Sequence, residues 1–292
     1  MMKKRSFSLL FLIVAVTQAF VWAQTAPTDI PAEFDPGKAP GTLRILTYNI
    51  RVGYGFNDLD DLSGLDLEAV GNVISAIKPD YAGIQEVDRN NGRSEGKDQI
   101  QVIGKMAGLH SYYGKAIDFD GGQYGIGALS AENAVSFKRV PLPIPYEADR
   151  VLIEMEFEDF VFFNTHLSLT AEYRADAAAI INSELSHLQK PVILTGDLNV
   201  SGYEEYLTLF GDRWTVLSPE EPSFPADSPN ARLDYILIAD PKNRVPLNSP
   251  IWKESVVRSE VVPTVASDHR PVFIDLNFEK IKTAINNPGH AE

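Results

Sequence analysis

Apolar residues follow two different spacings in the first third of the chain. Leu43–Ile50 (LRILTYNI) and Asp80–Val87 (DYAGIQEV) are short apolar runs, which are typical of buried strands. Between them, Leu67 and Ile74 belong to an apolar stripe at helical spacing within Leu65–Lys78, and a Pro-Asp pair then interrupts the pattern. This order of strand, helix and strand predicts a βαβ crossover with two parallel strands.

The rest of the chain continues to mix strands and helices. We expect helices over Asp98–Ala107, Thr170–Gln189 (capped by Thr170) and Tyr203–Phe210. The predicted strands are Ile126–Ser130, Val151–Phe157, Phe160–Leu167, Val192–Leu194, Leu233–Ala239 and Pro271–Phe278, with Val261–Pro263 as a candidate edge strand. The second and third of these are separated by Glu158 and Asp159 alone, which predicts a hairpin. Two packed sheets with helices outside them, in one domain, account for this order.

Residues 1–23 have the pattern of a secretory signal peptide. A basic start at residues 3–5 precedes the apolar stretch Leu9–Val16, and Ala23 fits a cleavage point. The apolar stretch is short for a membrane span, and no second one follows, so we expect no stable span once the signal is removed. We therefore expect an exported protein, periplasmic or extracellular; a retained N-terminal anchor is the alternative.

The remaining chain divides by composition. Residues 24–41 are rich in Pro, Ala and Asp and predict a linker, residues 42–279 hold the folded domain, and residues 280–292 read as a polar tail. The 292 residues contain no cysteine, which excludes disulfides and thiolate chemistry, and carry a formal charge of −14. That charge disfavours broad binding to nucleic acid or anionic membranes, although a bound cation reverses the sign of a local field. We expect a monomer.

Candidate chemistry begins at the end of one apolar strand. In PVILTGDLNV, Asp197 and Asn199 lie two positions apart and face the same way if the backbone stays extended. A carboxylate beside an amide oxygen suits a hard cation, a positioned water or a phosphoryl oxygen. An ordinary turn that closes a strand uses the same residue types, so this motif alone leaves both interpretations open.

The other predicted strands also end on, or follow, side chains that bind metals or move protons. Each of them has an unremarkable structural explanation when taken alone, such as a turn former or a buried histidine. Their shared position at strand ends is what suggests one site. These residues are Asn49, Glu86, His166, Asp234, Asp268 and His269.

Seven short motifs in a fixed order give the sequence a family resemblance. They are TYNI, IQEVD, YGIGALS, NTHL, TGDLN, RLDYIL and SDHRPV, and they extend from about Leu43 to Phe278. In this order the chain resembles the endonuclease/exonuclease/phosphatase superfamily, the metal-dependent phosphoesterases similar to deoxyribonuclease I. The resemblance implies an α/β fold: a four-layered α/β sandwich of two packed mixed β-sheets flanked by helices. It also implies that residues 42–279 form the catalytic domain.

The resemblance implies a metal site built on one main carboxylate. Glu86 matches the main metal ligand, and Asn49 and Asp268 complete or support the site. Mg²⁺ is the expected ion, with Mn²⁺ able to replace it, because carboxylate and amide oxygens suit hard cations. Zinc is the alternative, although the histidines lack the helical HxxxH spacing.

The resemblance also implies the roles of the remaining site residues. Asp197 and Asn199 match the pair that positions the attacking water and the phosphoryl oxygens. His269 matches the general base or electrostatic partner, oriented by Asp234. His166 matches the second histidine, which contacts the phosphate or protonates the leaving group.

The loop Arg89–Gln99 resembles a family-variable substrate loop. Arg93 and Asp98 are its candidate substrate-binding side chains, and a solvated loop explains them equally well. Tyr124 has two interpretations as well, substrate contact or packing, and we favour packing.

The function expected from these observations is an exported phosphoesterase. It would use a divalent metal to hydrolyse a phosphodiester or phosphomonoester by attack of water. The sequence lacks a basic, aromatic-rich stripe, so a small or lipid-linked phosphoester is favoured over nucleic acid. An extracellular endonuclease is the alternative within the class, and a non-catalytic binding protein on the same fold is the alternative outside it.

Overall fold

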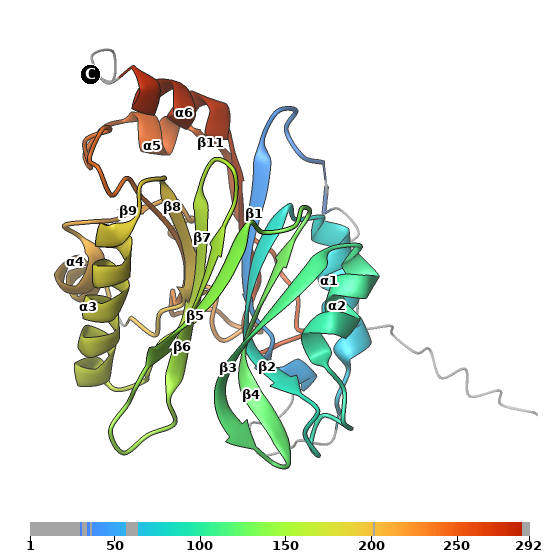
Figure 1. The fold of residues 1–292 in the computed structure, drawn as a ribbon. Coiled ribbons are helices and arrows are strands. Elements are labelled where there is room, and N and C mark those ends of the chain that lie inside the picture. The colour runs from blue at the N-terminus through green and yellow to red at the C-terminus, as the bar shows by residue number, and fades with distance from the viewer. Residues whose placement is uncertain (1–29, 31–33, 36, 57–63, 201, 288–292) are drawn as a thin grey trace, which may run out of the picture.

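Two six-stranded sheets lie face to face with helices on their outer sides (Figure 1). This architecture comes from a computed structural model that describes residues 30, 34–35, 37–56, 64–200 and 202–287. Helices α1 and α2 cover the outer side of one sheet, and α3 and α4 cover the outer side of the other (Figure 1). The four-layered α/β sandwich predicted from the sequence is therefore confirmed.

The first sheet has the strand order β11-β12-β1-β2-β4-β3. The predicted crossover is confirmed, because β1 and β2 pair in parallel and α1 connects them. The Asp66 carboxylate caps α1 by accepting from the Ala69 backbone N–H, and Lys78 ends the helix in the left-handed region. The elements on this side are β1 (Leu43–Asn49), η1 (Arg51–Gly53), α1 (Leu67–Ile77), β2 (Tyr81–Arg89), α2 (Gln99–Ala107), β3 (His110–Phe119), β4 (Gly122–Ser130), β11 (Val256–Val261) and β12 (Val272–Leu276).

The second sheet has the strand order β5-β6-β7-β8-β10-β9. The predicted β6–β7 hairpin is confirmed. Strand β7 pairs in parallel with β8, and α3 connects the two along the chain. Strand β5 (Ser136–Leu142) was not predicted from the sequence. Four of its first five side chains are exposed, so too few residues face the core to give a recognisable apolar pattern. The elements on this side are β5 (Ser136–Leu142), β6 (Arg150–Glu156), β7 (Val161–His166), α3 (Ala171–His187), β8 (Val192–Asp197), α4 (Tyr203–Phe210), β9 (Thr215–Val216) and β10 (Asp234–Ala239).

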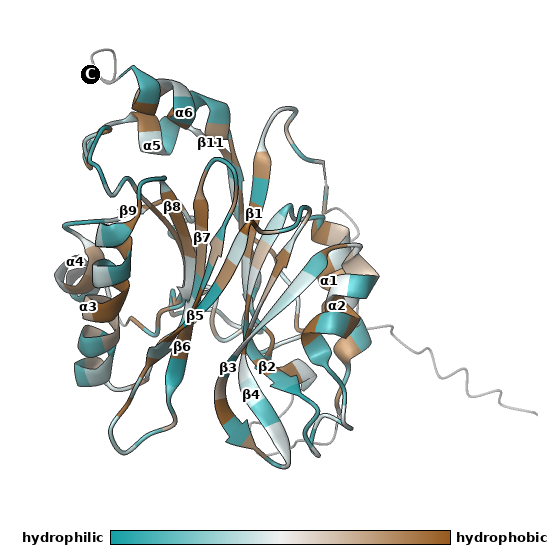
Figure 2. Ribbon diagram, viewed as in Figure 1, coloured by the Kyte–Doolittle hydropathy of each residue, from teal (hydrophilic) through white to brown (hydrophobic). Residues whose placement is uncertain are grey.

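Three apolar clusters fill the spaces between the four layers. One lies between the sheets, and one lies under each pair of outer helices. The apolar strand residues therefore face either the opposite sheet or a helix. Figure 2 shows the hydrophobic residues, in brown, along the strands of the sandwich. Strands buried on both faces explain the near-continuous apolar runs at Leu43–Ile50 and Val192–Leu194.

Three local predictions were wrong. Thr170 precedes α3 but makes no capping bond, because its hydroxyl donates to the Glu147 carboxylate instead. The edge strand is β11, which ends where Val261–Pro263 was expected to begin.

Much of the expected polar tail is helix α6 (Phe278–Asn286), which buries Phe278 and Ile281 against the core between the sheets. A short helix, α5 (Ile251–Glu254), packs beside α6.

The expected signal peptide, residues 1–23, lies outside the described residues, as do residues 288–292. Part of the expected linker does not behave as a free linker, because the Phe34 ring packs edge-on against Phe273 and the Gly37 carbonyl accepts from Arg44. Arg44 is itself fully buried and pairs with Asp275. Within the described part of the chain, no helix combines the length and the apolar character needed to cross a membrane.

A layer of buried polar side chains joins the two sheets. Asn164 of β7 crosses to the other sheet, where its amide donates to the Ile84 and Gly127 carbonyls. Its side-chain oxygen accepts from the amide of Gln85 (2.7 Å) and from the Thr195 hydroxyl (3.2 Å). A fully bonded polar group in a core is highly directional, so this layer fixes how the sheets sit against each other.

Gly83 makes the close approach at this layer possible. A Cβ atom there would lie 2.1 Å from Thr195 Oγ1 and 2.4 Å from Asn164 Oδ1. Strand β2 therefore tolerates only a hydrogen at this position.

We predict that Gly83→Ala lowers the free energy of unfolding by about 2–3 kcal/mol, because the methyl group overpacks the core and displaces buried hydrogen bonds. Urea unfolding followed by circular dichroism measures this change. The matched control is Gly202→Ala, since no atom lies within 4 Å of a Cβ placed there. Its effect should stay within about 0.5 kcal/mol. Equal stabilities of the two variants would contradict the assigned role of Gly83.

Candidate active site

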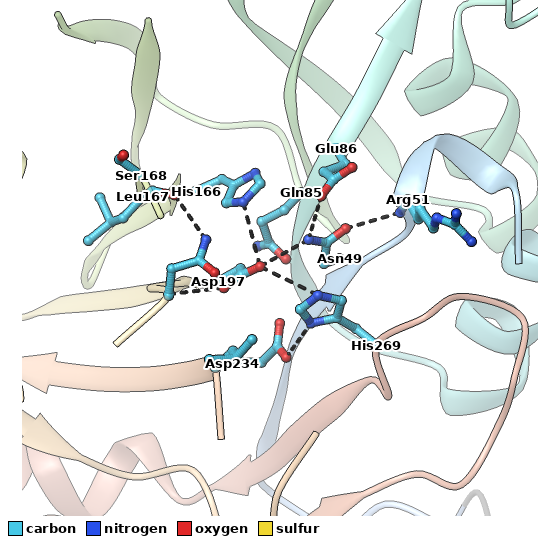
Figure 3. A network of polar contacts seen from close by, with 12 residues as sticks. Asn49, Arg51, Gln85, Glu86, His166, Leu167, Ser168, Asp197, Asp234 and His269 are labelled. Carbon is cyan, nitrogen blue, oxygen red and sulfur yellow. Dashed lines mark hydrogen bonds and ion pairs between the residues drawn. The ribbon is translucent and has the colours of Figure 1, made fainter. Parts of the chain in front are cut away.

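Six chain segments bring polar side chains together at one end of the sandwich (Figure 3). Parallel β7 and β8 end there, and β10 begins there because it runs antiparallel to β8, with Asp234 opposite Asp197. The loop before β12 reaches the same place. The side chains that the structure assembles there are Asn49, Glu86, His166, Asp197, Asn199, Asp234, Asp268 and His269.

Glu86 reaches the site because β2 contains a bulge. Residues 85 and 86 oppose the single residue 126 of β4, and Glu86 has φ of 56°. A bulge residue in the left-handed region turns its side chain away from the regular alternation of the strand. Gln85 therefore points into the inter-sheet layer, while Glu86 turns to the site.

Asn49 links two carboxylates across the site. Its amide nitrogen donates to Glu86 (3.0 Å) and to Asp197 Oδ2 (3.0 Å), and its oxygen accepts from the Arg51 backbone N–H. These three bonds define which side of the amide faces the carboxylates. In this arrangement Asn49 acts as a donor that holds the two acids in place.

Asp197 lies at the centre of the cluster. Its Oδ2 atom lies 3.5 Å from His166 Nε2 and 3.7 Å from His269 Nε2. Its Oδ1 atom accepts from the backbone N–H of Asn199, whose own amide donates to the Leu167 carbonyl. Asp197 and Asn199 thus form a tight turn at the end of β8, and the turn is bonded to the end of β7.

His269 and Asp234 form a buried dyad. His269 Nδ1 lies 2.8 Å from Asp234 Oδ2, which also accepts from the Ser223 hydroxyl, and the Phe224 ring packs against the imidazole at 4.8 Å. Burial alone would lower the pKa of His269, but the carboxylates of Asp234 and Asp197 raise it to about 10. Nδ1 therefore carries a proton, and Nε2 points toward Asp197.

The two histidines differ in charge. Burial, Arg150 and the cationic His269 together hold the pKa of His166 well below its usual value, so its imidazole is neutral. Arg150 Nη1 lies 3.4 Å from Nδ1 of His166 and can only donate, which leaves the proton of the neutral ring on Nε2. Burial also raises the pKa of Asp197 to about 7. The site thus holds one cationic and one neutral imidazole around a single carboxylate.

Asp268 and its neighbour Ser267 fasten the last loop to β1. The Ser267 hydroxyl donates to the Asn49 carbonyl and lies 3.2 Å from Asp268 Oδ1. Asp268 Oδ2 lies 3.8 Å from Arg51 Nε. Asp268 therefore sits at the end of β1 beside the chain segment that carries Asn49.

The sequence matches the family model described as the endonuclease/exonuclease/phosphatase family over residues 46–269. The chain belongs to this family. Its members hydrolyse phosphoesters, and the resemblance seen in the seven motifs is confirmed. None of the curated proteins matches the sequence significantly.

Solved structures show that the fold is shared across the family. A family protein from Beutenbergia cavernae superimposes with a TM-score of 0.64 at 22% identity and covers 80% of this chain and 71% of its own. The mannosyl-6-phosphatase Bt3783 of Bacteroides thetaiotaomicron gives 0.62 at 18% identity, with 80% and 99% covered. The human Nocturnin catalytic domain gives 0.58 at 15% identity, with 82% and 95% covered.

The donor set fits a divalent cation, which family members generally use. Burial raises the pKa of Glu86, and none of the described Lys or Arg side chains pairs with its carboxylate at ion-pair distance. A half-buried acid with an amide as its hydrogen-bond partner gains most from a bound cation. Asp197, Asp234 and His269 also bring ligand atoms within 4.8 Å of one another, but the short Asp234–His269 bond identifies them better as a dyad with its acceptor.

The predicted substrate loop separates into two parts. The Arg93 guanidinium pairs with the buried Asp88 and lies over the rings of Phe119 and Tyr124. Asp98 instead caps α2 and pairs with Arg89, contacts that give it a structural role. The buried Gln99 side chain accepts a hydrogen bond from the Asp88 backbone N–H and donates one to the Val52 carbonyl.

Tyr124 lies where a substrate-facing role fits. Burial and the nearby Glu86 carboxylate raise the pKa of its phenol, and the guanidinium groups of Arg150 and Arg93 oppose this rise. Our preference for simple packing does not account for these charged neighbours.

Arg150 was missed by the sequence interpretation. It opens β6 beside His166, and its Nε atom is buried without a partner among the described residues. In the sequence it stands just before the apolar run VLIEME, where it looks like an ordinary loop residue. Only the pairing of β6 with β7 brings it to the histidine.

We predict that Mg²⁺ or Mn²⁺ raises the melting temperature of the protein and that Glu86→Gln abolishes this rise, because the ion binds the folded state through this carboxylate. Thermal unfolding with and without the ion measures the shift. Glu154→Gln is the matched control, since Glu154 is a half-buried glutamate that pairs with Lys138 on the second sheet. A metal-induced shift that survives in Glu86→Gln would rule out this ligand assignment.

Proposed function

We propose that the protein is an exported, divalent-metal-dependent phosphoesterase that hydrolyses a small or lipid-linked phosphoester by attack of water. The observation that carries the proposal is the convergence of the His269–Asp234 dyad and the neutral His166 on Asp197, next to Glu86. Such an arrangement of acids, imidazoles and amides is suited to activating water and stabilising a phosphoryl transition state.

Glu86 and Asp268 would hold the ion, with Asn49 supporting the carboxylate. When bound, Mg²⁺ neutralises phosphate charge and polarises the phosphoryl group, and Mn²⁺ can replace it. Asn49 keeps the Glu86 and Asp197 carboxylates at a fixed separation through the two hydrogen bonds that its side-chain amide donates. The protein thus prepares a rigid set of oxygen ligands before substrate arrives.

The remaining residues move protons and orient oxygen atoms. Asp197, held by the Asn49 amide and the Asn199 backbone N–H, is placed to orient the attacking water and accept its proton. His269 remains an imidazolium stabilised by Asp234 and offers its positive charge to a phosphoryl oxygen. Together these groups divide water activation and charge stabilisation between separate side chains.

The opposite side of the site is suited to the leaving group and the phosphoryl oxygens. His166 presents its Nε2–H, which can donate a hydrogen bond to a phosphoryl oxygen or to the departing oxygen while the imidazole stays neutral. Arg150 places its guanidinium beside His166 and Tyr124, and a guanidinium is the side-chain group best matched to a phosphate oxygen. Tyr124 lies near Glu86 and Arg150, and the Arg93 guanidinium lies over its ring, so these two side chains are further candidate substrate contacts.

Charge supports the proposed substrate class. The chain carries a formal charge of −14, and a polyanionic nucleic acid would be repelled outside the immediate site. Structurally similar proteins include a mannosyl-6-phosphatase, whose name gives a small phosphomonoester as its substrate, so the fold accommodates this substrate class. The basic and apolar start of the chain supports export to the periplasm or the extracellular space.

We predict that Mg²⁺ supports hydrolysis of bis-(p-nitrophenyl) phosphate, that a chelator abolishes it, and that His269→Ala lowers kcat/KM by about 10²–10⁴-fold because the cationic imidazole is lost. Release of nitrophenolate measures the rate. His187→Ala is the matched control, because His187 lies exposed on α3. Full activity of His269→Ala, or activity that persists in chelator, would contradict the mechanism.

A panel of natural esters then distinguishes the substrate classes. Phosphatidylcholine, glycerophosphodiesters, inositol phosphates and plasmid DNA are offered at equal phosphate concentration. The proposal expects turnover of a small or lipid-linked ester, and product from plasmid DNA alone would favour the endonuclease alternative.

A further inference from the structure

Two strongly exposed apolar side chains stand on loops that adjoin residues of the candidate active site. Among the described residues, Tyr146 and Leu169 are the most exposed large apolar side chains, at 100% and 77%. Tyr146 belongs to the loop between β5 and β6, and Leu169 belongs to the turn between β7 and α3. We call these two residues the rim pair.

The rim pair is held in place by bonds between its two loops. The Glu147 carboxylate accepts from the hydroxyls of Ser168 (2.7 Å) and Thr170, and these residues flank Leu169. The loop that carries Tyr146 is also closed internally, because the Ile144 N–H donates to Asp149. The two loops that carry Tyr146 and Leu169 are therefore fastened to each other by hydrogen bonds.

The rim pair lies close to the catalytic groups along the chain. Leu169 follows His166 by three residues, so their Cα atoms are at most about 11 Å apart. Tyr146 precedes Arg150 by four residues, which limits their Cα separation to about 15 Å. In addition, the Asn199 amide donates to Leu167, two positions before Leu169.

The backbone at Tyr146 adds an independent sign of function. Its φ of 69° lies in the left-handed region, which is unfavourable for a tyrosine. No packing contact compensates for this strain, since the ring is fully exposed. The fully exposed ring does not stabilise this backbone conformation by packing, and strained backbone of this kind is typical of functional sites.

The shape and the charge of this surface indicate what that partner is. The rim pair projects from two loop tips, which suits insertion into a soft interface better than enclosure of a small ligand. Tyrosine in particular favours the boundary between water and lipid. Glu147, Asp149 and Glu172 lie within three positions of the pair along the chain, and the whole chain is acidic, so an anionic surface would be repelled.

We infer that Tyr146 and Leu169 dock the protein on an electrically neutral, zwitterionic lipid surface and so present the site to a phosphoester in that surface. This inference rests on the proposed phosphoesterase function and narrows its substrate class to a lipid-linked ester. The rim pair binds the surface, while the groups around Asp197 act on the phosphoester.

Cosedimentation with phosphatidylcholine vesicles tests the docking. The doubly substituted variant Tyr146→Asn/Leu169→Ser should bind at least tenfold more weakly than the unmodified chain, because it loses two buried apolar groups. Asparagine tolerates the left-handed backbone, so Tyr146→Asn leaves the loop conformation intact. The matched control is Val135→Ser/Val257→Ser, because these side chains are also strongly exposed, with Val135 at 72%, and lie on other segments.

Lipid charge and mode of binding provide further checks. Vesicles of phosphatidylglycerol should bind the protein more weakly than vesicles of phosphatidylcholine. Equal vesicle binding by the rim variant and the control would overturn the inference. Light scattering could instead show a dimer for the unmodified chain and a monomer for the rim variant. This result would also overturn the inference, because the rim pair would then bind a second copy of the chain.

Hydrolysis separates this inference from the proposed function. The ratio of the rate on vesicle phosphatidylcholine to the rate on bis-(p-nitrophenyl) phosphate should fall at least tenfold in the rim variant. Hydrolysis of the soluble ester without vesicle binding would overturn the docking inference alone. Vesicle binding by a protein that hydrolyses neither ester would instead overturn the phosphoesterase proposal and leave the docking intact.

Discussion

The hydrogen bonds that Asn164 makes across the sandwich are the constraint on which the site depends. Its amide bonds to the backbone of β2 and β4, and its oxygen accepts from Gln85 and Thr195. Apolar packing between sheets is tolerant of small shifts, but a buried amide with all its bonds made is not. The bonds therefore fix the distance and the register of two sheets that contribute different halves of the chemistry.

Three residues of the candidate active site follow this layer directly along their strands. Asn49, His166 and Asp197 each follow a layer residue (Thr47, Asn164, Thr195) by two positions, so each pair shares one strand face, about 6–7 Å apart. Strand β2 does not follow this two-residue spacing. Its bulge turns Glu86 to the site directly after the layer residue Gln85. The polar layer thus positions the candidate site, and the bulge adds Glu86, the carboxylate proposed to hold the metal. Activity and stability are coupled here through the same backbone positions.

Much of the fold and of the site was predictable from local patterns. The apolar runs gave the central strands, and the ordered motifs gave the family and the side chains that meet around Asp197. What the sequence did not show depends on tertiary contacts. Arg150 becomes a site residue only when β6 pairs with β7, and Thr170 prefers Glu147 to its own helix end. The tail was misread because Phe278 and Ile281 were not counted as an amphipathic stripe. Asp98 was a candidate substrate contact with a solvated loop as the alternative, and the structure shows it capping α2 and pairing with Arg89.

The most direct test of this account is the variant Asn164→Leu, which keeps the branched shape and the number of heavy atoms of the side chain and removes the hydrogen bonds between the sheets. Its unfolding free energy and its kcat on bis-(p-nitrophenyl) phosphate are measured at a temperature where circular dichroism shows a folded protein. The account predicts that both fall, with kcat reduced by at least tenfold because His166 and Asp197 lose their fixed positions. A folded Asn164→Leu protein with unchanged kcat would show that the buried layer does not position the site.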